Sequence, residues 1–302
     1  MAFHPLEPYN ELPLLPPIEE LESKEILKAT ITAHKALARL EGSLSNLPNP
    51  SILLDSIGLQ EAKVSSEIEN IITTHDELYQ YAVAERSVGN TATKEVLHYK
   101  KALWFGYEQV KANELLTTNL FTRLVQIIKE NQTGIRTTPG TQIINDKTRN
   151  IIYTPPVGED VIRTKLKNLE AFLNINEDEL DPLIKMAVAH YQFEAIHPFG
   201  DGNGRTGRII NILYLVQQKL LSIPVLYLSR YILEHRTDYY QLLREVTEEG
   251  KWQRWILYMI HALEETSKLT LFKIDEIKDA MTSMGEAIKK ELPGIYSKDL
   301  VE

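Results

Sequence analysis

Cysteine is absent from the 302-residue sequence, which excludes disulfides and thiolate chemistry. Long apolar runs are also absent, since none approaches the roughly 20 residues that a membrane-spanning helix needs. Residues 1–11 lack the apolar stretch of a signal peptide. We therefore expect a soluble, cytoplasmic protein with no membrane partner.

An excess of positive charge is absent as well: 42 acidic residues outnumber 33 lysines and arginines, and the net charge at pH 7 is −9. A protein that binds nucleic acid across a whole face usually presents a basic surface, so the composition argues against that function. His190 and His197 lack the H-E-x-x-H arrangement of zinc hydrolases, and His190 fits better as a hydrogen-bonded core residue. What remains is an ordinary globular composition, 43% apolar and 25% charged, sufficient for one large domain or two modest ones.

Helical periodicity dominates the apolar pattern after a proline-rich, extended arm over residues 1–20. The arm has leucines that could pin it to the body, and residues 73–93 read as a polar joint. Residues 142–145 and 150–153 instead form two short apolar segments around a polar turn, which predicts a β-hairpin. The chain is thus expected to be mainly α-helical with one small hairpin. The expected helices cover residues 18–47, 51–59, 61–72, 97–113, 119–131, 161–173, 182–196, 209–220, 252–263 and 269–291.

Residues 197–208 read HPFGDGNGRTGR and lie between two apolar-periodic runs, which predicts a tight loop between two buried helices. Gly202 and Gly204 allow the backbone to approach a ligand closely. Asn203 is a good N-cap, so we expect the next helix to start near Gly204. The free N–H groups at such a helix start form a site for an anion.

Charged side chains complete this loop. Arg205 and Arg208 are three residues apart and project from the same side of the first helical turn, which suits a polyphosphate. Asp201 would repel phosphate oxygens unless a hard cation such as Mg²⁺ lay between them. His197, at the end of the preceding helix, is placed to accept a proton from a nucleophile. A solvated glycine-rich turn is the alternative, but it does not explain why Asp201 and both arginines face one loop.

The loop resembles the signature of the Fic family, H-x-F-x-[D/E]-G-N-G-R-x-x-R. The resemblance implies a helical core that transfers AMP from ATP to a Ser, Thr or Tyr hydroxyl of a target protein, which can include the chain itself. Pyrophosphate is released, and Mg²⁺ accompanies ATP. Every fixed position of the signature is met, by His197, Phe199, Asp201, Gly202, Asn203, Gly204, Arg205 and Arg208.

The same resemblance implies a role for each polar position. His197 would be the catalytic base, and Asp201 would hold the metal. Backbone N–H groups from Gly202 to Gly204 would bind the α-phosphate, with help from the side chain of Asn203. Arg205 and Arg208 would bind the outer phosphates.

An aromatic residue on a later helix lies beside the adenine in Fic relatives. Tyr240 is the candidate here, and Tyr239 is its rival. An aromatic residue at helical spacing is, however, more often part of the core.

A second Fic motif precedes the signature. Ser65, Glu69 and Asn70 match the inhibitory pattern [S/T]-x-x-x-E-[G/N], in which the glutamate pairs with the second arginine of the signature, here Arg208. A carboxylate on Arg208 would remove the partner that the γ-phosphate needs, so the resemblance implies an autoinhibited enzyme. The alternative is a solvated glutamate on a helix.

The expected hairpin, within residues 136–156, corresponds to the flap of Fic proteins. There Gln142, Ile143 and Ile144 would hold a target segment by strand pairing, which tolerates varied target sequences because it uses main-chain bonds. A surface hairpin without contacts is the alternative.

We expect three parts in the chain: an N-terminal helical region (residues 1–90) with the inhibitory helix, a catalytic core (91–265), and a C-terminal helix (266–302). The last residues resemble the opening of a winged-helix domain that would touch DNA in a longer chain, and dimers are common in the family. Two functional alternatives stay open. The first is an enzyme that uses another nucleotide donor or removes AMP, and the second is a regulatory or DNA-binding module that only senses ATP.

Overall fold

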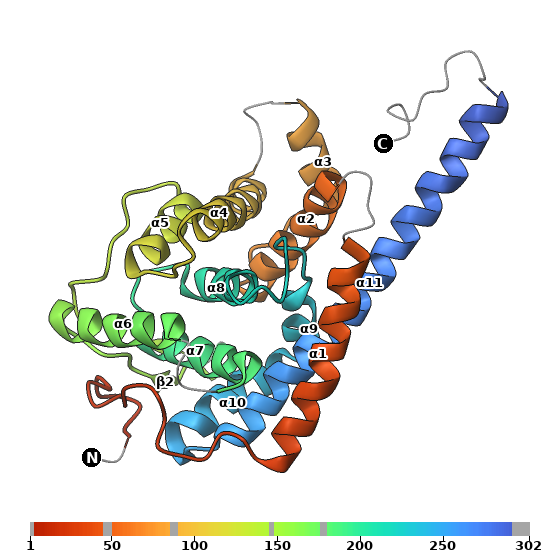
Figure 1. Ribbon diagram of the computed structural model, residues 1–302. Coiled ribbons are helices and arrows are strands. Elements are labelled where there is room, and N and C mark those ends of the chain that lie inside the picture. Colours follow the sequence, from red (N-terminus) through yellow and green to blue (C-terminus); the bar gives the residue numbers. More distant parts are fainter. Residues whose placement is uncertain (1–2, 45–49, 85–89, 145–147, 176–179, 292–302) are drawn as a thin grey trace.

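The computed structural model describes residues 3–44, 50–84, 90–144, 148–175 and 180–291. It confirms the predicted mainly α-helical class with one small hairpin (Figure 1). The helices are α1 (Lys24–Leu44), α2 (Pro50–Ile68), α3 (His75–Ala84), α4 (Thr91–Asn113), α5 (Thr118–Lys129), α6 (Glu159–Asn174), α7 (Pro182–Ile196), α8 (Asn203–Gln217), α9 (Leu228–Glu234), α10 (Arg236–Glu249) and α11 (Trp252–Glu291), and the strands are β1 (Ile143–Ile144) and β2 (Ile151–Tyr153).

Helix α8 is the centre of the molecule (Figure 1). It contacts α2, α4, α5, α7 and α9, so a different helix covers each of its sides. Its residues Ile209, Ile212 and Leu213 are fully buried. A helix that is apolar on every side belongs in the core, as the sequence predicted for residues 209–220.

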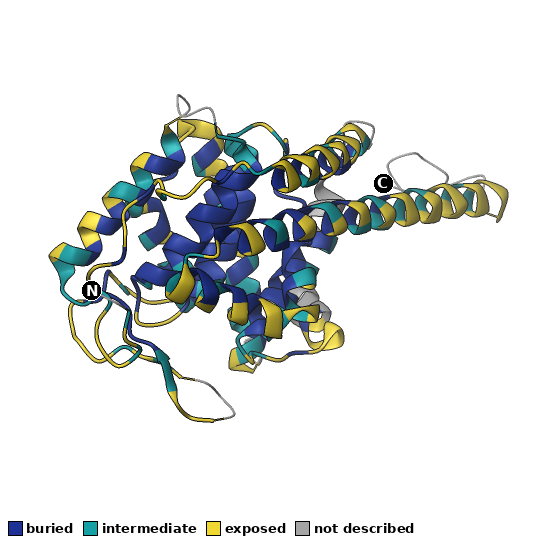
Figure 2. Cartoon of the chain, turned by 90° about the horizontal axis from the view of Figure 1, so that it is seen from below, coloured by how far each residue is buried: buried dark blue, intermediate teal, exposed yellow. Residues whose placement is uncertain are grey.

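Helices α1 and α11 lie side by side along one flank, and the far half of α11 projects beyond the body (Figures 1 and 2). The prediction of separate helices over 252–263 and 269–291 is wrong, because α11 is continuous. The polar residues between them continue the helix because glutamate and lysine are good helix formers, and Lys268 Nζ pairs with Glu264 Oε1 one turn earlier at 2.6 Å.

Two boundaries near the N-terminus also differ from the prediction. The helices expected over 51–59 and 61–72 are the single helix α2, which ends at Ile68, so Ile72 is exposed rather than packed inward. Glutamine, glutamate and alanine at positions 60–62 favour helix and let α2 continue. The polar joint over 73–93 contains α3, whose first turn is acidic at Asp76 and Glu77, as suits a helix N-terminus.

The N-terminal arm is held to the body by its backbone carbonyls. Lys165 Nζ on α6 donates to Leu12 O at 2.6 Å, and Gln192 Nε2 on α7 donates to Pro13 O at 2.8 Å. Leu12 and Leu15 are buried, as predicted, whereas Leu14 and Ile18 are exposed. The arm therefore lies against the same helix, α7, that leads into the loop at 197–202.

The hairpin follows the expected position, with Ile143 opposite Tyr153 and Ile144 opposite Ile151 in antiparallel register. Its base is anchored because Tyr153 Oη donates to Ala195 O of α7 at 2.7 Å. Among the described residues, no helix combines the length and apolar character needed to cross a bilayer. The winged-helix expectation falls on residues 292–302, outside the described ranges.

Candidate active site

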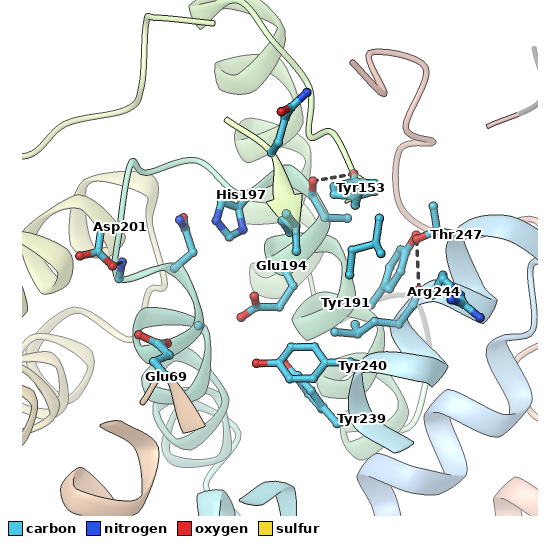
Figure 3. A pocket seen from close by; sticks show the side chains of 18 of the residues that line it. Glu69, Tyr153, Tyr191, Glu194, His197, Asp201, Tyr239, Tyr240, Arg244 and Thr247 are labelled. Atoms are coloured by element: carbon cyan, nitrogen blue, oxygen red, sulfur yellow. Dashed lines mark hydrogen bonds between the residues drawn. The ribbon is translucent and has the colours of Figure 1, made fainter. Parts of the chain in front are cut away.

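The loop at 197–202 joins α7 to α8 and is bent by two residues with positive φ. His197 ends α7 at φ 47°, and its N–H still donates to Phe193 O at 3.0 Å. Gly202 has φ 83°, a conformation that glycine adopts without strain. A pocket of about 400 Å³ opens beside the loop, with walls from the hairpin, α7 and α10 (Figure 3).

The prediction that Asn203 caps α8 is wrong. Gly202 is the N-cap and α8 begins at Asn203. The amide of Asn203 bonds across the loop instead, accepting from Phe199 N at 2.9 Å and donating to Phe199 O at 2.8 Å. Phe199 is fully buried, as expected, so these bonds satisfy backbone groups that would otherwise lack partners. A contact between Asn203 and phosphate stays a prediction.

His197 lines the pocket, and its Nδ1 is buried without a hydrogen-bond partner. Burial, with the nearby charge of Arg136, lowers the pKa of His197 to about 4. The imidazole is therefore neutral at pH 7, as a general base must be. Arg136 also fixes the loop, since its Nε donates to His197 O at 2.7 Å and its backbone N to Pro198 O at 2.9 Å. The sequence prediction did not single out Arg136.

Glu69 pairs with both signature arginines. Its Oε1 lies 2.9 Å from Arg208 Nη2, as predicted, and its Oε2 lies 2.8 Å from Arg205 Nε, which was not predicted. Ser65 completes the contact, because Arg208 Nε donates to its hydroxyl at 2.7 Å. Burial opposes the charge of Arg208, but the carboxylate of Glu69 holds the pKa of Arg208 above its ordinary value.

The backbone at Glu69 and Gly204 is shaped for this contact. Glu69 is the first residue after α2, in a turn that Asn70 completes at φ 61°, a conformation that asparagine tolerates better than most residues. Gly204 has no side chain where one would collide: a Cβ there would lie 2.5 Å from Glu69 Oε1 and 2.9 Å from Arg208 Nη1. The glycine thus makes room for the ion pair.

Two charged residues outside the signature join this network. Arg205 Nη1 lies 2.5 Å from Glu95 Oε2 of α4, and Lys129 Nζ of α5 lies 2.7 Å from Asp201 Oδ2 and 3.3 Å from Glu95. The sequence analysis missed both residues. Single charges on amphipathic helices look like solvated surface, and no local pattern marks them.

Asp201 is the exposed end of the network, with 61% of its side chain accessible. Burial opposes its ionisation, but Lys129 and Arg205 together hold the pKa of its carboxyl below the ordinary value. No group of three or more His, Asp or Glu side chains in the described ranges could hold a metal alone. One ionised, accessible carboxylate fits Mg²⁺ that takes most of its ligands from phosphate and water.

Glu194, one helical turn before His197, is a pocket residue that the sequence analysis did not identify. Figure 3 shows it directed into the same space as Glu69 and Tyr240. Its Oε1 is buried without a hydrogen-bond partner. Burial raises the pKa of Glu194 to about 7, against the opposing charge of Arg208. This carboxyl therefore titrates near neutral pH.

The structure separates the two candidate aromatic residues. Tyr239 is buried, and its hydroxyl lies 2.9 Å from His190 Nε2, which also confirms His190 as a hydrogen-bonded core residue. Both tyrosines line the pocket, but Tyr240 has 41% of its surface exposed and Tyr239 only 2%. Tyr240 is thus the one with an open face, although contact with adenine stays a prediction.

The hairpin forms the opposite wall. Gln142, Ile143 and Tyr153 line the pocket, whereas Ile144 is exposed and is not among the lining residues. The sheet of the described residues has only β1 and β2, so the outer edge of β1 is open to another strand. Phe3 of the N-terminal arm also lines the pocket and stacks on Tyr153 at a centroid distance of 5.7 Å.

Comparisons with known proteins identify relatives of this chain. The model of the Fic/DOC family N-terminal region matches residues 27–108. The protein adenylyltransferase Fic of Culex quinquefasciatus is 30% identical over 139 residues, which cover 44% of this chain and 26% of that protein. A probable protein adenylyltransferase of Aquifex aeolicus is 30% identical over 202 residues, 65% of this chain and 57% of that protein. The chain spans about a quarter of the length of the first insect relatives.

Solved structures show the same fold. A Fic family protein from Desulfovibrio desulfuricans G20 superposes with a TM-score of 0.70 at 18% identity, covering 90% of this chain and 82% of that one. Fic-1 from C. elegans superposes with a TM-score of 0.62 at 18% identity, covering 85% and 73%. These likenesses confirm the expected helical architecture.

Proposed function

We propose that this Fic-family chain is a protein adenylyltransferase, which transfers AMP from ATP to a Ser, Thr or Tyr hydroxyl of a target protein. One observation carries the proposal: a neutral, half-buried histidine opens into the same pocket as a glycine-bent loop and the buried Arg208. The relatives named protein adenylyltransferases support the same reaction.

Each side chain has a role in this reaction. His197 takes the proton of the target hydroxyl, whose oxygen forms a bond to the α-phosphorus. The bond from the α-phosphorus to the bridging oxygen breaks, and pyrophosphate leaves. Asp201 would hold Mg²⁺, which neutralises phosphate charge when bound. Catalysis of this kind depends mainly on positioning and charge stabilisation.

We further propose that Glu69 inhibits the enzyme. Its carboxylate engages Arg208, which lines the pocket and would otherwise be available to the outer phosphates, and also Arg205, which is buried and is not among the lining residues. ATP would have to replace both ion pairs to bind productively. A variant without this carboxylate should therefore be more active, even though it loses native contacts.

The test is to incubate wild type, Glu69→Gly and Glu69→Gly/His197→Ala with α-³²P-labelled ATP and Mg²⁺, and to measure label on protein. Stronger label in Glu69→Gly that disappears in the double variant would support both proposals. Equal label in wild type and Glu69→Gly would remove the inhibitory role. Label that persists at full strength without His197 would remove the base.

A second candidate is removal of AMP from a modified protein by water. The observation in its favour is that Glu69 lines the same pocket as His197, so a carboxylate is available to orient water. Loss of release in Glu69→Gln, measured with AMP-labelled protein, would separate this reaction from transfer. Parallel assays with GTP, UTP and CTP would define the donor.

A further inference from the structure

Lys129 reaches the loop from outside the signature. It is the last residue of α5, and its stem lies along the loop, because a Cβ at Gly202 would be 3.7 Å from Lys129 Cγ and Cδ. Its ammonium is 2.7 Å from Asp201 Oδ2. Asp201 lines the pocket, so this ammonium holds a carboxylate that faces the ligand space.

Lys129 has a second carboxylate in reach. Its Nζ is 3.3 Å from both oxygens of Glu95, which also pairs with Arg205. The side chain of Lys129 is only 18% exposed, so a charge without a partner there would be costly. Glu95 provides that partner even when Asp201 is engaged elsewhere.

The ion pairs form one connected chain of charges. Lys129 and the two signature arginines supply three positive groups, and Glu69, Glu95 and Asp201 supply three negative groups. Of the positive groups, only Lys129 is paired with Asp201 at hydrogen-bond distance; Arg205 Nη2 lies 3.5 Å away. A divalent cation on Asp201 would therefore meet the ammonium of Lys129 first.

We propose that Lys129 is a substitute cation for Asp201: it neutralises the carboxylate when no divalent metal is bound and remains on Glu95 when a metal takes Asp201. Two cations a few ångströms apart repel each other, so Lys129 weakens metal binding. The same ammonium adds positive charge beside the phosphate site, so Lys129 strengthens binding of metal-free nucleotide. The inference rests on the proposed function only in placing the ATP phosphates at this loop.

The experiment uses the Glu69→Gly background, so that both signature arginines are released. Binding of ATP is measured by calorimetry in EDTA and at saturating Mg²⁺, for the parent and for Lys129→Met. We expect Lys129→Met to weaken metal-free ATP binding by about tenfold and to lower the Mg²⁺ concentration needed for half-maximal ATP binding. If Lys129 had only a structural role, Lys129→Met would weaken ATP binding in EDTA and ATP binding at saturating Mg²⁺ by the same factor.

A second arm needs no nucleotide. Binding of Mn²⁺, which favours the same oxygen ligands, is followed by electron paramagnetic resonance in the ATP-free proteins. Lys129→Met should bind Mn²⁺ more tightly than the parent. Two controls should bind Mn²⁺ as the parent does: Lys129→Arg, which keeps the charge, and Lys101→Met, on an exposed part of α4.

The outcomes separate the two proposals. If the parent binds no ATP, the proposed function fails, and the Mn²⁺ arm still decides the role of Lys129. If the parent binds ATP but Lys129→Met changes neither the metal-free affinity nor the affinity for Mn²⁺, the inference about Lys129 is wrong. The inference is also wrong if Lys129→Met binds both metal-free ATP and Mn²⁺ more weakly than the parent.

Discussion

The two ends of the pocket are held together by different physics. At the arginine end, Arg205 and Arg208 are buried and cross-linked by the carboxylates of Glu69 and Glu95. At the opposite end, the walls are Tyr240, the hairpin and the N-terminal arm, joined by ring contacts and backbone hydrogen bonds. Ion pairs and hydrogen bonds in a charged network require particular side chains at particular distances, whereas an apolar wall requires only side chains of suitable shape. The first end therefore tolerates little change, and the second tolerates much.

The largest expected effect is that of replacing His197. We expect His197→Ala, in the Glu69→Gly background, to reduce AMP transfer by about 10²- to 10⁴-fold, because the reaction loses its base. Initial rates with labelled ATP measure the loss, and an unchanged unfolding midpoint shows that the fold survives. A loss below tenfold would mean that another group accepts the proton.

Gly204→Ala tests how tightly the network is packed. The new Cβ would lie 2.5 Å from Glu69 Oε1, so we expect a loss of about 1–3 kcal/mol in the free energy of unfolding. In Glu69→Gly the collision with Oε1 is absent and only Arg208 Nη1, 2.9 Å from the new Cβ, remains, so the same substitution should cost less. Denaturant unfolding of wild type, the two single variants and the double variant gives the coupling free energy between positions 204 and 69.

Gly200→Ala is the matched control, because a Cβ there has no atom within 4 Å. It should not change the unfolding free energy in either background. An equal cost of Gly204→Ala with and without Glu69 would show that the collision lies elsewhere.

Glu194, between the two ends, gives a pH-dependent prediction. Its pKa is raised from 4.5 to about 7 in the folded protein, so the folded state binds more protons than the unfolded state between these values. Stability from this group is full below pH 4.5 and is lost as pH rises through 7. Glu194→Gln should therefore be more stable than wild type by about 1–2 kcal/mol at pH 8, and not at pH 4.5.

Urea unfolding at both pH values measures this difference. Glu108→Gln, an exposed change on α4, is the control and should leave the pH dependence unaltered. If Glu194→Gln shifts stability equally at both pH values, Glu194 does not titrate in this range.

The smallest effect is expected at the apolar end. Tyr240→Ala should weaken binding of ATP by about fivefold, or about 1 kcal/mol, through loss of an open ring face. Tyr239→Phe, which removes the hydroxyl bound to His190, should lower thermal stability and leave ATP affinity unchanged. Calorimetry in the Glu69→Gly background measures both. The reverse result would assign the ring that contacts ATP to Tyr239.

The loop at 197–208 could be predicted from the sequence, whereas the residues on other helices that contact it could not. The role of the loop at 197–208 and the pairing of Glu69 with Arg208 were predicted because two short motifs resemble those of the Fic family. The second pairing of Glu69, with Arg205, and the contacts of Glu95 and Lys129 depend on how distant helices pack, which no local pattern records. Asn203 was assigned to a cap because its amide has several bonding choices, and burial of the Phe199 backbone decides among them.

Helix boundaries show the same division. The apolar period located most helices, but polar residues at 264–268 looked like a break, because an apolar pattern does not register the helix propensity of glutamate and lysine. The hairpin was predicted because its two apolar segments and the polar turn between them lie within one short stretch of sequence. The exposure of Ile72 follows from α2 ending at Ile68, which the neighbouring elements decide.

The position of Phe3 affects where an affinity tag can be attached to this protein. Phe3 lines the pocket and stacks on Tyr153, so a peptide joined ahead of it enters the chain at the pocket rim. An affinity tag placed there would bring its own serine, threonine or tyrosine hydroxyls close to His197. Under the proposed reaction such a tag would be an acceptor, and its label would be mistaken for automodification of the chain.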